Sequence, residues 1–547
     1  MALGSDLKDL KPLTFTEVDE VNHPTVTYIY TESTDSNPSN HDKCRASSGR
    51  IDLLRNPSNT PTTPWSFKAL LDTLADVFLP TGYPHSVTED YTYYQIFDSL
   101  QAFSSSIAGL LSSRAVLQGV GVGNADASPT SALLLHILQD SSGRIATILF
   151  AHRVGTALEP ECKKYRLAAD VFNDLAMILD CLSPIIPAGA LRVIVLSTAG
   201  VLRALCGVAG GSSKASLSAH FSKWGNLAEV NAKDSSQETI ISLVGMLVGS
   251  FVVSHVTGFA ATWIALLMLL ALHLSLNYAA VRSVQMTSLN RQRANIVFST
   301  LVSSDEDFMR FMDHSPGTSP STHSEPLFQT TTTSFPQNQN AVPWRLQILT
   351  PSQVAKHEKI FEEDGILRWT IPETVAARHL HSRPIGTCRI GVSLSQFLPG
   401  PSSSSSLTVR TSRSSQSLKT GIPLPHLSAL FTDERYILFL EPGKKNKWHA
   451  NILLKSTCTP QSQLKGWLHA LLAARVLSCS ASVPSSRRGT EPEKNKRISS
   501  ILDILHRTLS FLNRDGRFER YMAALEDAGW DLTVGALETR PGRRIVG

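Results

Sequence analysis

The pattern of hydrophobic residues divides the chain near Trp65. Residues 1–64 are rich in Ser, Thr, Asn and Pro and hold few apolar clusters, which is typical of a disordered region. Within them, the segment TVTYIY at 25–30 predicts one short strand. From Trp65 to about Thr300, apolar residues recur at helical spacing. This pattern predicts helices over 66–80, 86–117, 161–182 and 188–208.

The most apolar part of the chain is the segment 239–281, in which His255 and His273 are the only residues that could carry a charge near neutral pH. A membrane span needs about 20 predominantly apolar residues. The segment fits one full span over 258–280 and a shorter one over 240–254, separated by a polar break at 254–258. We expect a helical hairpin in a membrane. The alternative is a pair of fully buried helices in a large bundle.

Beyond the helical region the pattern becomes that of a small α+β unit. Short strands are expected at ILRWTI, CRIGVSL, RYILFLE and WHANILLK, the last two joined as a hairpin by PGKKNK, with a helix following over 461–477. The predicted organisation is a disordered region (1–64), a helical membrane domain (65–311), a linker (312–343), a small α+β domain (344–484) interrupted by a Ser-rich loop (400–422), a basic linker (485–497) and a C-terminal helical segment (498–547). The expected fold is therefore mainly α.

Charge and cysteine content narrow the classes of function. Charged residues make up 18% of the chain and the net charge is +5, which argues against the concentrated basic face of a nucleic-acid-binding protein. The seven cysteines are scattered and never form a C-x-x-C pair, as expected of reduced thiols inside the cell. The acidic first segment has no apolar core, so neither a secretory signal nor an organelle presequence is expected there. We expect an intracellular membrane location, with the organelle undetermined.

A glycine run, LQGVGVGNADASP at 117–129, invites comparison with phosphate-binding loops. The dinucleotide pattern G-x-G-x-x-G fails, because Asn124 and Asp126 stand where its last glycine is required. We interpret Gly119, Gly121 and Gly123 as a close-packing surface or a broken helix, since small residues let backbones approach each other. A ligand-binding loop remains the alternative.

Polar residues form stripes at helical spacing on three predicted helices. Each stripe alone fits a solvated face, but beside such apolar neighbours the three together predict a buried polar network. The candidate network residues are Asp90, Tyr94, Asp98, Arg166, Asp170, Asn173, Asp174, Asn226, Glu229 and Lys233. We expect Asp90 and Asp98 to pair with Arg166. The stripe that starts at Asp170 is expected to meet the one that starts at Asn226.

No motif recommends an enzyme or a metal site. His379, His381 and Cys388 lack convincing metal-ligand spacing. A pyridoxal-phosphate enzyme needs a Schiff-base lysine and a phosphate cup. Lys233 is the only lysine among the candidate network residues, and no glycine-rich phosphate loop accompanies it. We expect no catalytic residues, no cofactor and no metal.

Several sequence blocks, taken together, are specific enough to indicate one protein family. They include FLPTGYPHSVTEDYTYYQIFDSLQAFSSSIAG (78–109), KKYRLAADVFNDLAMILD (163–180), GVAGGSSKASLSAHFSKWGNLAEVNAKDSSQE (207–238) and NYAAVRSVQMTSLNRQRA (277–294). With the glycine run, these blocks resemble the root UVB sensitive (RUS) family over about residues 65–300, and AGWDL extends the resemblance loosely to the C-terminal part.

The resemblance implies a membrane protein connected with vitamin B6 homeostasis and, in plants, with ultraviolet-B responses. It supplies no agreed catalytic residue. Because no plastid transit peptide is expected here, we do not expect a light-response role. We hypothesise a membrane-associated protein that handles or transports a small polar metabolite. The alternative is a non-catalytic membrane scaffold that acts through a protein partner, a paralogue or a second copy of itself.

Overall fold

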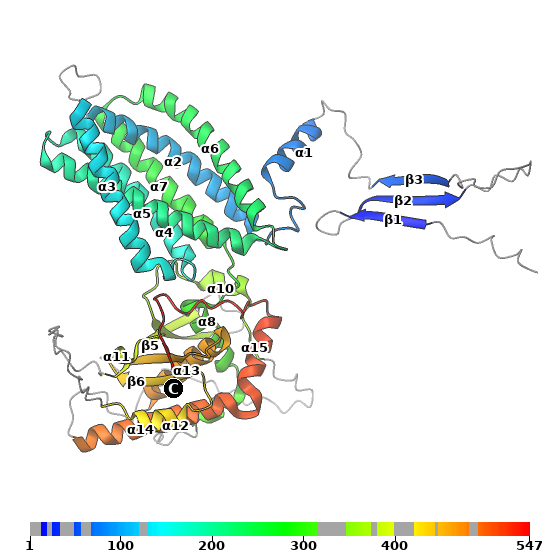
Figure 1. Ribbon diagram of the computed structural model, residues 1–547, viewed down its shortest axis with the longest axis vertical. Coiled ribbons are helices and arrows are strands. Elements are labelled where there is room, and N and C mark those ends of the chain that lie inside the picture. The colour runs from blue at the N-terminus through cyan, green and yellow to red at the C-terminus, as the bar shows by residue number, and fades with distance from the viewer. Residues whose placement is uncertain are drawn as a thin grey trace, which may run out of the picture.

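The computed structural model describes residues 13–18, 24–32, 49–55, 67–119, 129–313, 346–372, 380–398, 421–443, 447–480 and 491–546. The chain is mainly helical, as predicted, with a helical bundle above a C-terminal α+β domain in Figure 1. The predicted linker 312–343, the Ser-rich loop 400–422, and Gly121 and Gly123 lie wholly or almost wholly outside the described residues.

Six long helices form the bundle and run alternately up and down (Figure 1). They are α2 (Tyr91–Gly119), α3 (Pro129–Val154), α4 (Cys162–Leu182), α5 (Ala190–Phe221), α6 (Leu227–His255) and α7 (Phe259–Ser283), preceded by α1 (Phe67–Phe78). Short 3-10 turns, η2 (Gly155–Ala157) and η3 (Ser183–Ile185), link α3 to α4 and α4 to α5. The helix α2 packs against both α6 and α7, and α5 packs against α3 and α4.

The predicted helical hairpin is confirmed as helices α6 and α7. The helix α6 ends at His255 and α7 begins after its N-cap residue Gly258, so the break lies where the polar residues interrupt the apolar run. Both helices extend beyond the predicted spans. The helix α6 approaches α2 closely through Gly245, where an added Cβ would lie 2.8 Å from the Cβ of Ser106. Glycine is therefore required for this helix spacing.

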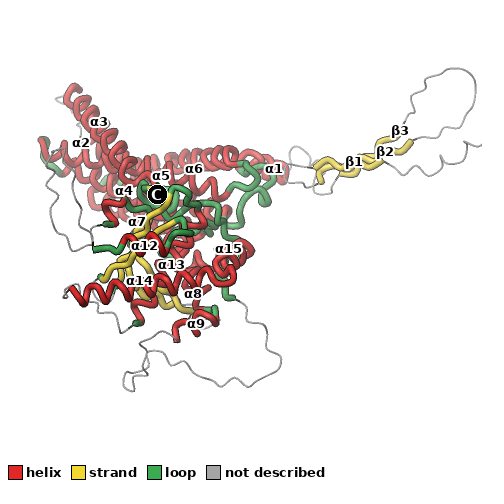
Figure 2. Tube along the Cα trace, turned by 60° about the horizontal axis from the view of Figure 1, so that its bottom comes forward, coloured by secondary structure: helices red, strands yellow, loops and turns green. Residues whose placement is uncertain are grey.

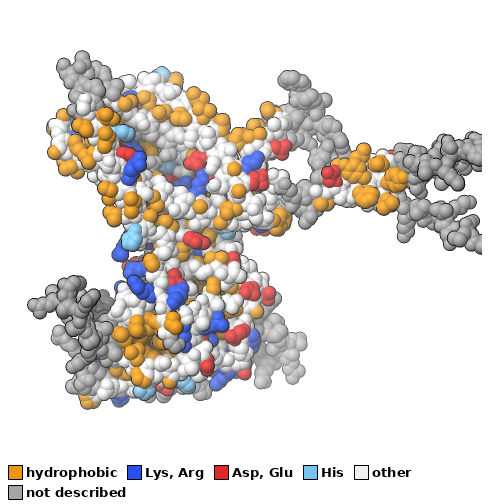
Figure 3. Space-filling view, in the orientation of Figure 1, with side chains coloured by type: hydrophobic (Ala, Val, Ile, Leu, Met, Phe, Trp, Pro, Cys, Tyr) orange, Lys and Arg blue, Asp and Glu red, His pale blue; other side chains and the backbone are white. Residues whose placement is uncertain are grey.

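The outer surface of the bundle is apolar. Large hydrophobic side chains are exposed along α3, α5, α6 and α7, among them Ile148, Ile194, Leu247 and Met268. By length and composition, α5, α6 and α7 could each cross a membrane, and only 11% to 17% of their most apolar windows is buried. Figure 3 shows hydrophobic side chains spread over this domain, whereas charged side chains are denser below. The sequence had indicated two of these three spans.

The C-terminal domain is built on a sheet of order β4-β5-β7-β6, with β8 beside β7. Its strands are β4 (Ile366–Pro372), β5 (Leu380–Ile390), β6 (Tyr436–Pro442), β7 (Trp448–Lys455) and β8 (Arg544–Ile545). The hairpin of β6 and β7 is antiparallel, as predicted, while β5 runs parallel to β7. The predicted CRIGVSL strand begins earlier, since β5 covers 380–390 and ends before most of that motif.

Helices pack against this sheet and complete its core. They are α8 (Arg291–Ser303), α9 (Glu306–Asp313), α10 (Pro351–His357), α11 (Leu394–Phe397), α12 (Leu424–Leu430), α13 (Pro460–Cys479), α14 (Glu491–Asn513) and α15 (Arg517–Asp527), with a 3-10 turn η4 (Arg514–Gly516). The buried helix α13 contacts the strands β4, β5, β6 and β7 and also α14 and α8. Its Trp467 Nε1 donates a hydrogen bond to Asn295 Oδ1 at 2.9 Å.

Two predicted boundaries differ from the structure. The helix α8 was assigned to the bundle, yet its residues 294–302 are all buried, most of them in the hydrophobic core of the C-terminal domain. The segment 498–547 joins the same core through residues such as Leu505 and Trp530. One C-terminal domain therefore begins near Arg291. The basic segment 485–497 is helical from Glu491 onward, as the start of α14.

A three-stranded antiparallel sheet lies apart from these two domains (Figures 1 and 2). It consists of β1 (Leu13–Val18), β2 (Pro24–Glu32) and β3 (Gly49–Arg55). The strand predicted at 25–30 is confirmed as part of β2, but β1 and β3 were not predicted. The prediction of a mostly disordered region with one short strand therefore missed β1 and β3, whose short sequence patterns give no sign of their pairing with β2.

Candidate functional site

Charged side chains meet in the middle of the bundle, where α2, α4 and α7 pack together. The guanidinium of Arg166 on α4 donates to Asp98 Oδ1 on α2 at 2.7 Å and to Asp170 Oδ1 on its own helix at 3.0 Å. The hydroxyl of Tyr94 lies 3.4 Å from Arg166 Nε. These side chains are buried, and removing an ion from water is costly unless it is paired and hydrogen-bonded.

Helix α7 completes this group with two residues that sequence reasoning missed. His273 Nδ1 lies 2.7 Å from Asp174 Oδ1, and its Nε2 lies 3.5 Å from Asp170 Oδ2. Asn277 donates a hydrogen bond from Nδ2 to Asp170 Oδ2. The available signal was their spacing, because residues four apart share one helix face. We call Asp98, Arg166, Asp170, Asp174, His273 and Asn277 the central cluster.

The central cluster has more acceptors than donors. Asp174 Oδ2 and Asn277 Oδ1 are buried and have no hydrogen-bond partner among the described residues. The same holds for Oε1 of Gln101, whose Nε2 donates to Asp98. The cluster contains three carboxylates and one guanidinium: Asp98 and Asp170 pair with Arg166, and Asp174 pairs with His273. An unsatisfied buried acceptor costs about 1–3 kcal/mol. The arrangement therefore favours a bound group that donates hydrogen bonds or carries positive charge.

Further buried ion pairs surround the central cluster without joining it. Lys214 Nζ on α5 lies 2.8 Å from Asp234 Oδ2 on α6, and Gln95 donates to the other oxygen of Asp234 at 2.7 Å. On α4, Asp180 pairs with Arg203 and accepts a hydrogen bond from a serine of α2. Polar contacts thus occur at several levels of the bundle interior, beneath its apolar exterior.

The structure brings together only some of the predicted network. Asp98 contacts Arg166 as expected, and Tyr94 and Asp170 join them. Asp90 does not contact Arg166: its Oδ2 lies 3.0 Å from His220 Nε2 and accepts from the backbone N–H of Gln285 at 2.6 Å. Because Asp90 lies before the first residue of α2, two turns from Asp98, it reaches the ends of α5 and α7 instead.

Asn226, Glu229 and Lys233 lie outside the central cluster, contrary to expectation. The amide of Asn226 donates to Ser86 O at 3.1 Å, and Glu229 Oε1 accepts from the backbone N–H of Thr81 at 2.8 Å. Lys233 Nζ donates to carbonyl oxygens at the end of α1. These residues occupy the first turns of α6 and face the segment before α2, so they anchor that segment rather than line the interior.

Asn173 lies at the edge of the central cluster and Gly119 lies beyond it. The amide of Asn173 reaches the hydroxyl of Ser105 at 3.4 Å and is half-buried. Gly119 ends α2, and an added Cβ there would lie 2.9 Å from the Ser183 hydroxyl oxygen. Its carbonyl oxygen accepts from Arg192 at 2.7 Å. These contacts of Gly119 agree with its interpretation as part of a close-packing surface.

No metal centre is evident in the described part of the chain. There, no group of three or more His, Cys, Asp or Glu side chains is arranged to hold a metal ion.

Comparisons with known proteins identify the bundle. A family model described as the vitamin B6 photo-protection and homoeostasis domain matches residues 64–305, which include every residue of the central cluster. RUS family member 1 of Dictyostelium discoideum is 45% identical over 229 residues, covering 41% of this chain and 43% of that protein. Protein root UVB sensitive 3 of Arabidopsis thaliana is 36% identical over 226 residues, covering 41% of this chain and 51% of that protein.

The chain spans about half the length of the curated relatives it matches, and the similarity lies in the bundle. No solved structure matches it significantly. The family model and the relatives agree on the same region. Residues 64–305, which include the helical bundle and helix α8, therefore match the domain of the RUS family.

Proposed function

We propose that the bundle is embedded in an intracellular membrane and binds, and moves across it, a small polar metabolite linked to vitamin B6 homoeostasis. The observation that carries this proposal is the inverted polarity of the bundle. Charged side chains lie inside it and large apolar side chains lie on its surface. Ionisable residues inside membrane bundles typically face the interior and mark solute pathways.

The apolar exterior supports the membrane part of the proposal. Exposed hydrophobic patches beyond a few hundred Å² are rare on soluble monomers and mark membrane or protein contacts. Here the exposed apolar side chains extend along the length of α6 and α7, from Ile240 to Phe251 and from Phe259 to Leu272. Hydrocarbon would solvate these faces, while the ion pairs stay in the protein interior.

The unsatisfied acceptors support the solute part. Asp174 Oδ2 and Asn277 Oδ1 lack donors, and forms of vitamin B6 carry hydroxyl, amine and protonated ring-nitrogen donors. The matched domain, described for vitamin B6 homoeostasis, contains both residues. We assign no catalytic step to the cluster.

Uptake by reconstituted protein tests the proposal. Purified full-length protein in liposomes is expected to accumulate radiolabelled pyridoxine, pyridoxal or pyridoxamine above protein-free liposomes. Asp174→Asn keeps the shape of the side chain but removes a charged acceptor. A hydrogen bond to a charged group contributes about 1.5–3 kcal/mol, so uptake is expected to fall by about tenfold or more.

The matched control is Glu238→Gln, which changes a half-exposed carboxylate on α6 that pairs with Lys214 outside the central cluster. We expect it to keep uptake near the wild-type level. Folded, correctly inserted protein that accumulates none of the three vitamers would overturn the proposal, as would full uptake by Asp174→Asn. A scaffold that acts through a partner protein would then be the better interpretation.

A further inference from the structure

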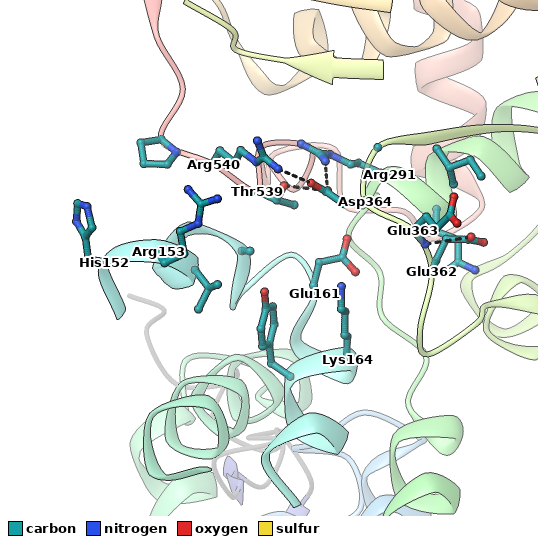
Figure 4. Close-up of a pocket in the computed structure, with 17 residues that line it drawn as sticks. His152, Arg153, Glu161, Lys164, Arg291, Glu362, Glu363, Asp364, Thr539 and Arg540 are labelled. Carbon is teal, nitrogen blue, oxygen red and sulfur yellow. Dashed lines mark hydrogen bonds and ion pairs between the residues drawn. The ribbon is translucent and has the colours of Figure 1, made fainter. Parts of the chain in front are cut away.

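A cavity lies where the bundle meets the C-terminal domain, away from the central cluster. It has a volume of about 320 Å³. The end of α3, the start of α4 and the start of α8 form part of its wall, and the segments 362–366 and 539–541 of the C-terminal domain complete it (Figure 4). Pockets for small molecules begin at about 300 Å³, so this cavity is large enough for a small metabolite.

The lining carries charges of both signs. Arg153, Lys164, Arg291 and Arg540 supply positive charge, and Glu161, Glu362, Glu363 and Asp364 supply negative charge. Several of these charges are already paired. Asp364 is shared by two guanidinium groups: it pairs with Arg291, and its other oxygen lies 3.5 Å from Arg540 Nη2. One carboxylate between two guanidinium groups leaves a net positive charge, so Arg540 is still able to attract an anion. Glu362 pairs with Arg368 at 2.9 Å, outside the cavity lining.

Arg153 and Glu161 form no ion pair or side-chain hydrogen bond within the described part of the chain. Lys164 Nζ lies 6.0 Å from the centroid of the Tyr165 ring. The charges of Arg293, Lys164 and Arg291 act on Glu161 and partly offset the effect of its burial. Figure 4 shows Arg153 and Arg540 extending toward the same end of the cavity, with Glu161 directed into its middle. Burial raises the pKa of Glu161, so a positive group beside it would be stabilising. The cavity thus offers cations at one end and a carboxylate in the middle.

We infer that this cavity binds a small molecule carrying an anionic group and a protonated amine. The anionic group lies at Arg153 and Arg540, where guanidinium groups suit phosphate and carboxylate oxygens. The amine lies near Glu161. This arrangement of charges favours a ligand of mixed charge over a simple anion, because the Glu161 carboxylate in the middle of the cavity would repel a plain anion and attract an amine. The site is distinct from the central cluster, and only the first probe below rests on the proposed function.

Binding to full-length protein in detergent, measured by isothermal titration calorimetry, tests the inference. The first probe is pyridoxamine 5′-phosphate, which carries a phosphate and a primary amine and belongs to the metabolite class named for the matched domain. The second probe is O-phosphoserine, which carries both groups without the pyridine ring. Pyridoxine 5′-phosphate lacks the amine and pyridoxamine lacks the phosphate, so both are expected to bind at least about tenfold more weakly than the first probe.

Two variants assign the ends of the site. Arg153→Gln is expected to weaken binding of the first probe by about tenfold or more, and Glu161→Gln by a similar factor. Glu161→Gln should leave the affinity for pyridoxine 5′-phosphate nearly unchanged, since that molecule has no amine. The matched controls are Arg144→Gln, on α3 but outside the cavity, and Glu159→Gln, an exposed neighbour; both should bind like the wild type.

The outcomes separate this site from the proposed transport. Failure of both probes to bind the folded protein would overturn the inference, and so would binding that neither variant weakens. Binding of O-phosphoserine alone, sensitive to both variants, would uphold the cavity and contradict its link to vitamin B6. The uptake assay uses Asp174→Asn in a different part of the bundle, so either proposal can fail without the other.

Discussion

Arg166 neutralises two buried carboxylates in the bundle interior. It is the guanidinium shared by Asp98 and Asp170, and all three side chains are buried. A buried ion pair adds little stability compared with apolar packing, but removal of one partner leaves an unpaired charge at a cost of about 3–5 kcal/mol. The contribution of this cluster to stability is therefore measurable mainly as the free-energy cost of removing one of its partners.

We predict that Arg166→Met destabilises the protein by about 3–5 kcal/mol, because two carboxylates lose their counter-ion. Unfolding by denaturant in detergent micelles measures the change. Arg144→Gln, whose ion pair with Asp140 is exposed to solvent, should shift stability by less than about 1 kcal/mol. Adding Asp98→Asn and Asp170→Asn to Arg166→Met should restore part of the loss. Equal stability of Arg166→Met and the wild type would contradict this account.

Glu358 joins the two domains through both of its oxygens. Lys163 Nζ of α4 lies 2.6 Å from Oε2, and Arg293 Nη1 of α8 lies 2.7 Å from Oε1. Burial alone would raise the pKa of Glu358, but these two cations lower it from 4.5 to about 2. The folded state therefore keeps this carboxylate ionised at a pH where the unfolded chain has already taken up a proton.

This lowered pKa predicts acid sensitivity at the domain junction. The stabilisation, about 3 kcal/mol, is fully present above the unfolded pKa of 4.5 and is lost as the pH falls through the folded pKa of about 2. Glu358→Gln should be less stable than the wild type at neutral pH. The unfolding curves of the two proteins should converge as the pH falls from about 5 to about 2. A stability difference that stays constant over this range would contradict the prediction.

At the scale of single residues, the polar stripes named four of the six residues of the central cluster. Asp98, Arg166 and Asp170 lie on facing sides of α2 and α4, and the structure pairs them. Asp174 was also named, but its partner is His273 on α7. His273 and Asn277 share one helix face, yet two polar residues in an otherwise apolar helix are a weak signal and were missed. Asp90 and Lys233 shared helical spacing with others but lay too near their helix ends to reach the interior.

At the scale of elements, the contact of α2 with α6 depends on glycine. A Cβ at Gly245 would lie 2.8 Å from Ser106 Cβ and 3.0 Å from the carbonyl oxygen of Phe103. Gly249, one turn later, meets Ile107 and Leu110 in the same way. Small residues at such spacing let helices approach closely in membranes, where packing rather than water drives their association.

We predict opposite effects for two glycine-to-alanine changes. Gly245→Ala should destabilise the bundle, because overpacking costs about 1–3 kcal/mol while the gain in helix propensity is only about 1 kcal/mol. Gly211→Ala on α5, where nothing lies within 4 Å of an added Cβ, should instead stabilise by up to about 1 kcal/mol. Thermal unfolding of the two variants in one detergent provides the comparison. Stabilisation by Gly245→Ala would contradict tight packing at Gly245.

The prediction of helices and strands succeeded where a helix had one clear apolar face or a clear apolar run. It failed where an element is buried on all sides. The hairpin of α6 and α7 followed from its apolar run and the break before Gly258. The helix α8 was predicted as part of the bundle, whereas its side chains pack in the core of the C-terminal domain. It is buried on every side, so its sequence gives no amphipathic face to indicate which core it joins. The sheet of β1 and β3 with β2 depends on pairings that no single strand pattern specifies.

At the scale of the whole molecule, the bundle and the C-terminal domain have opposite surface characters. The bundle exposes apolar side chains along α3, α5, α6 and α7, whereas the C-terminal domain has one large apolar core and a mixed, charged surface (Figure 3). Such a molecule suits two environments at once, with hydrocarbon around the bundle and water around the domain below it.

We predict that alkaline carbonate leaves the protein in the membrane pellet, because release would expose the apolar faces of α5, α6 and α7 to water. Fractionation of cells that produce the tagged full-length chain measures this, with a known peripheral protein as the release control. Complete release into the supernatant would mean that a protein partner, rather than lipid, covers these faces. The scaffold interpretation would then be favoured.

The contacts of Asp90 also show which chain segments lie together at one end of the bundle. Asp90 meets His220 and the N–H of Gln285, and Lys163 donates to Val284 O at 2.6 Å, so the start of α2, the start of α4 and the ends of α5 and α7 gather at one end of the bundle. With six helices alternating in direction, a bilayer around them would leave the segment before α2 and the C-terminal domain in the same compartment. The interdomain cavity lies at that end too, so only metabolites from one side of the membrane would reach it.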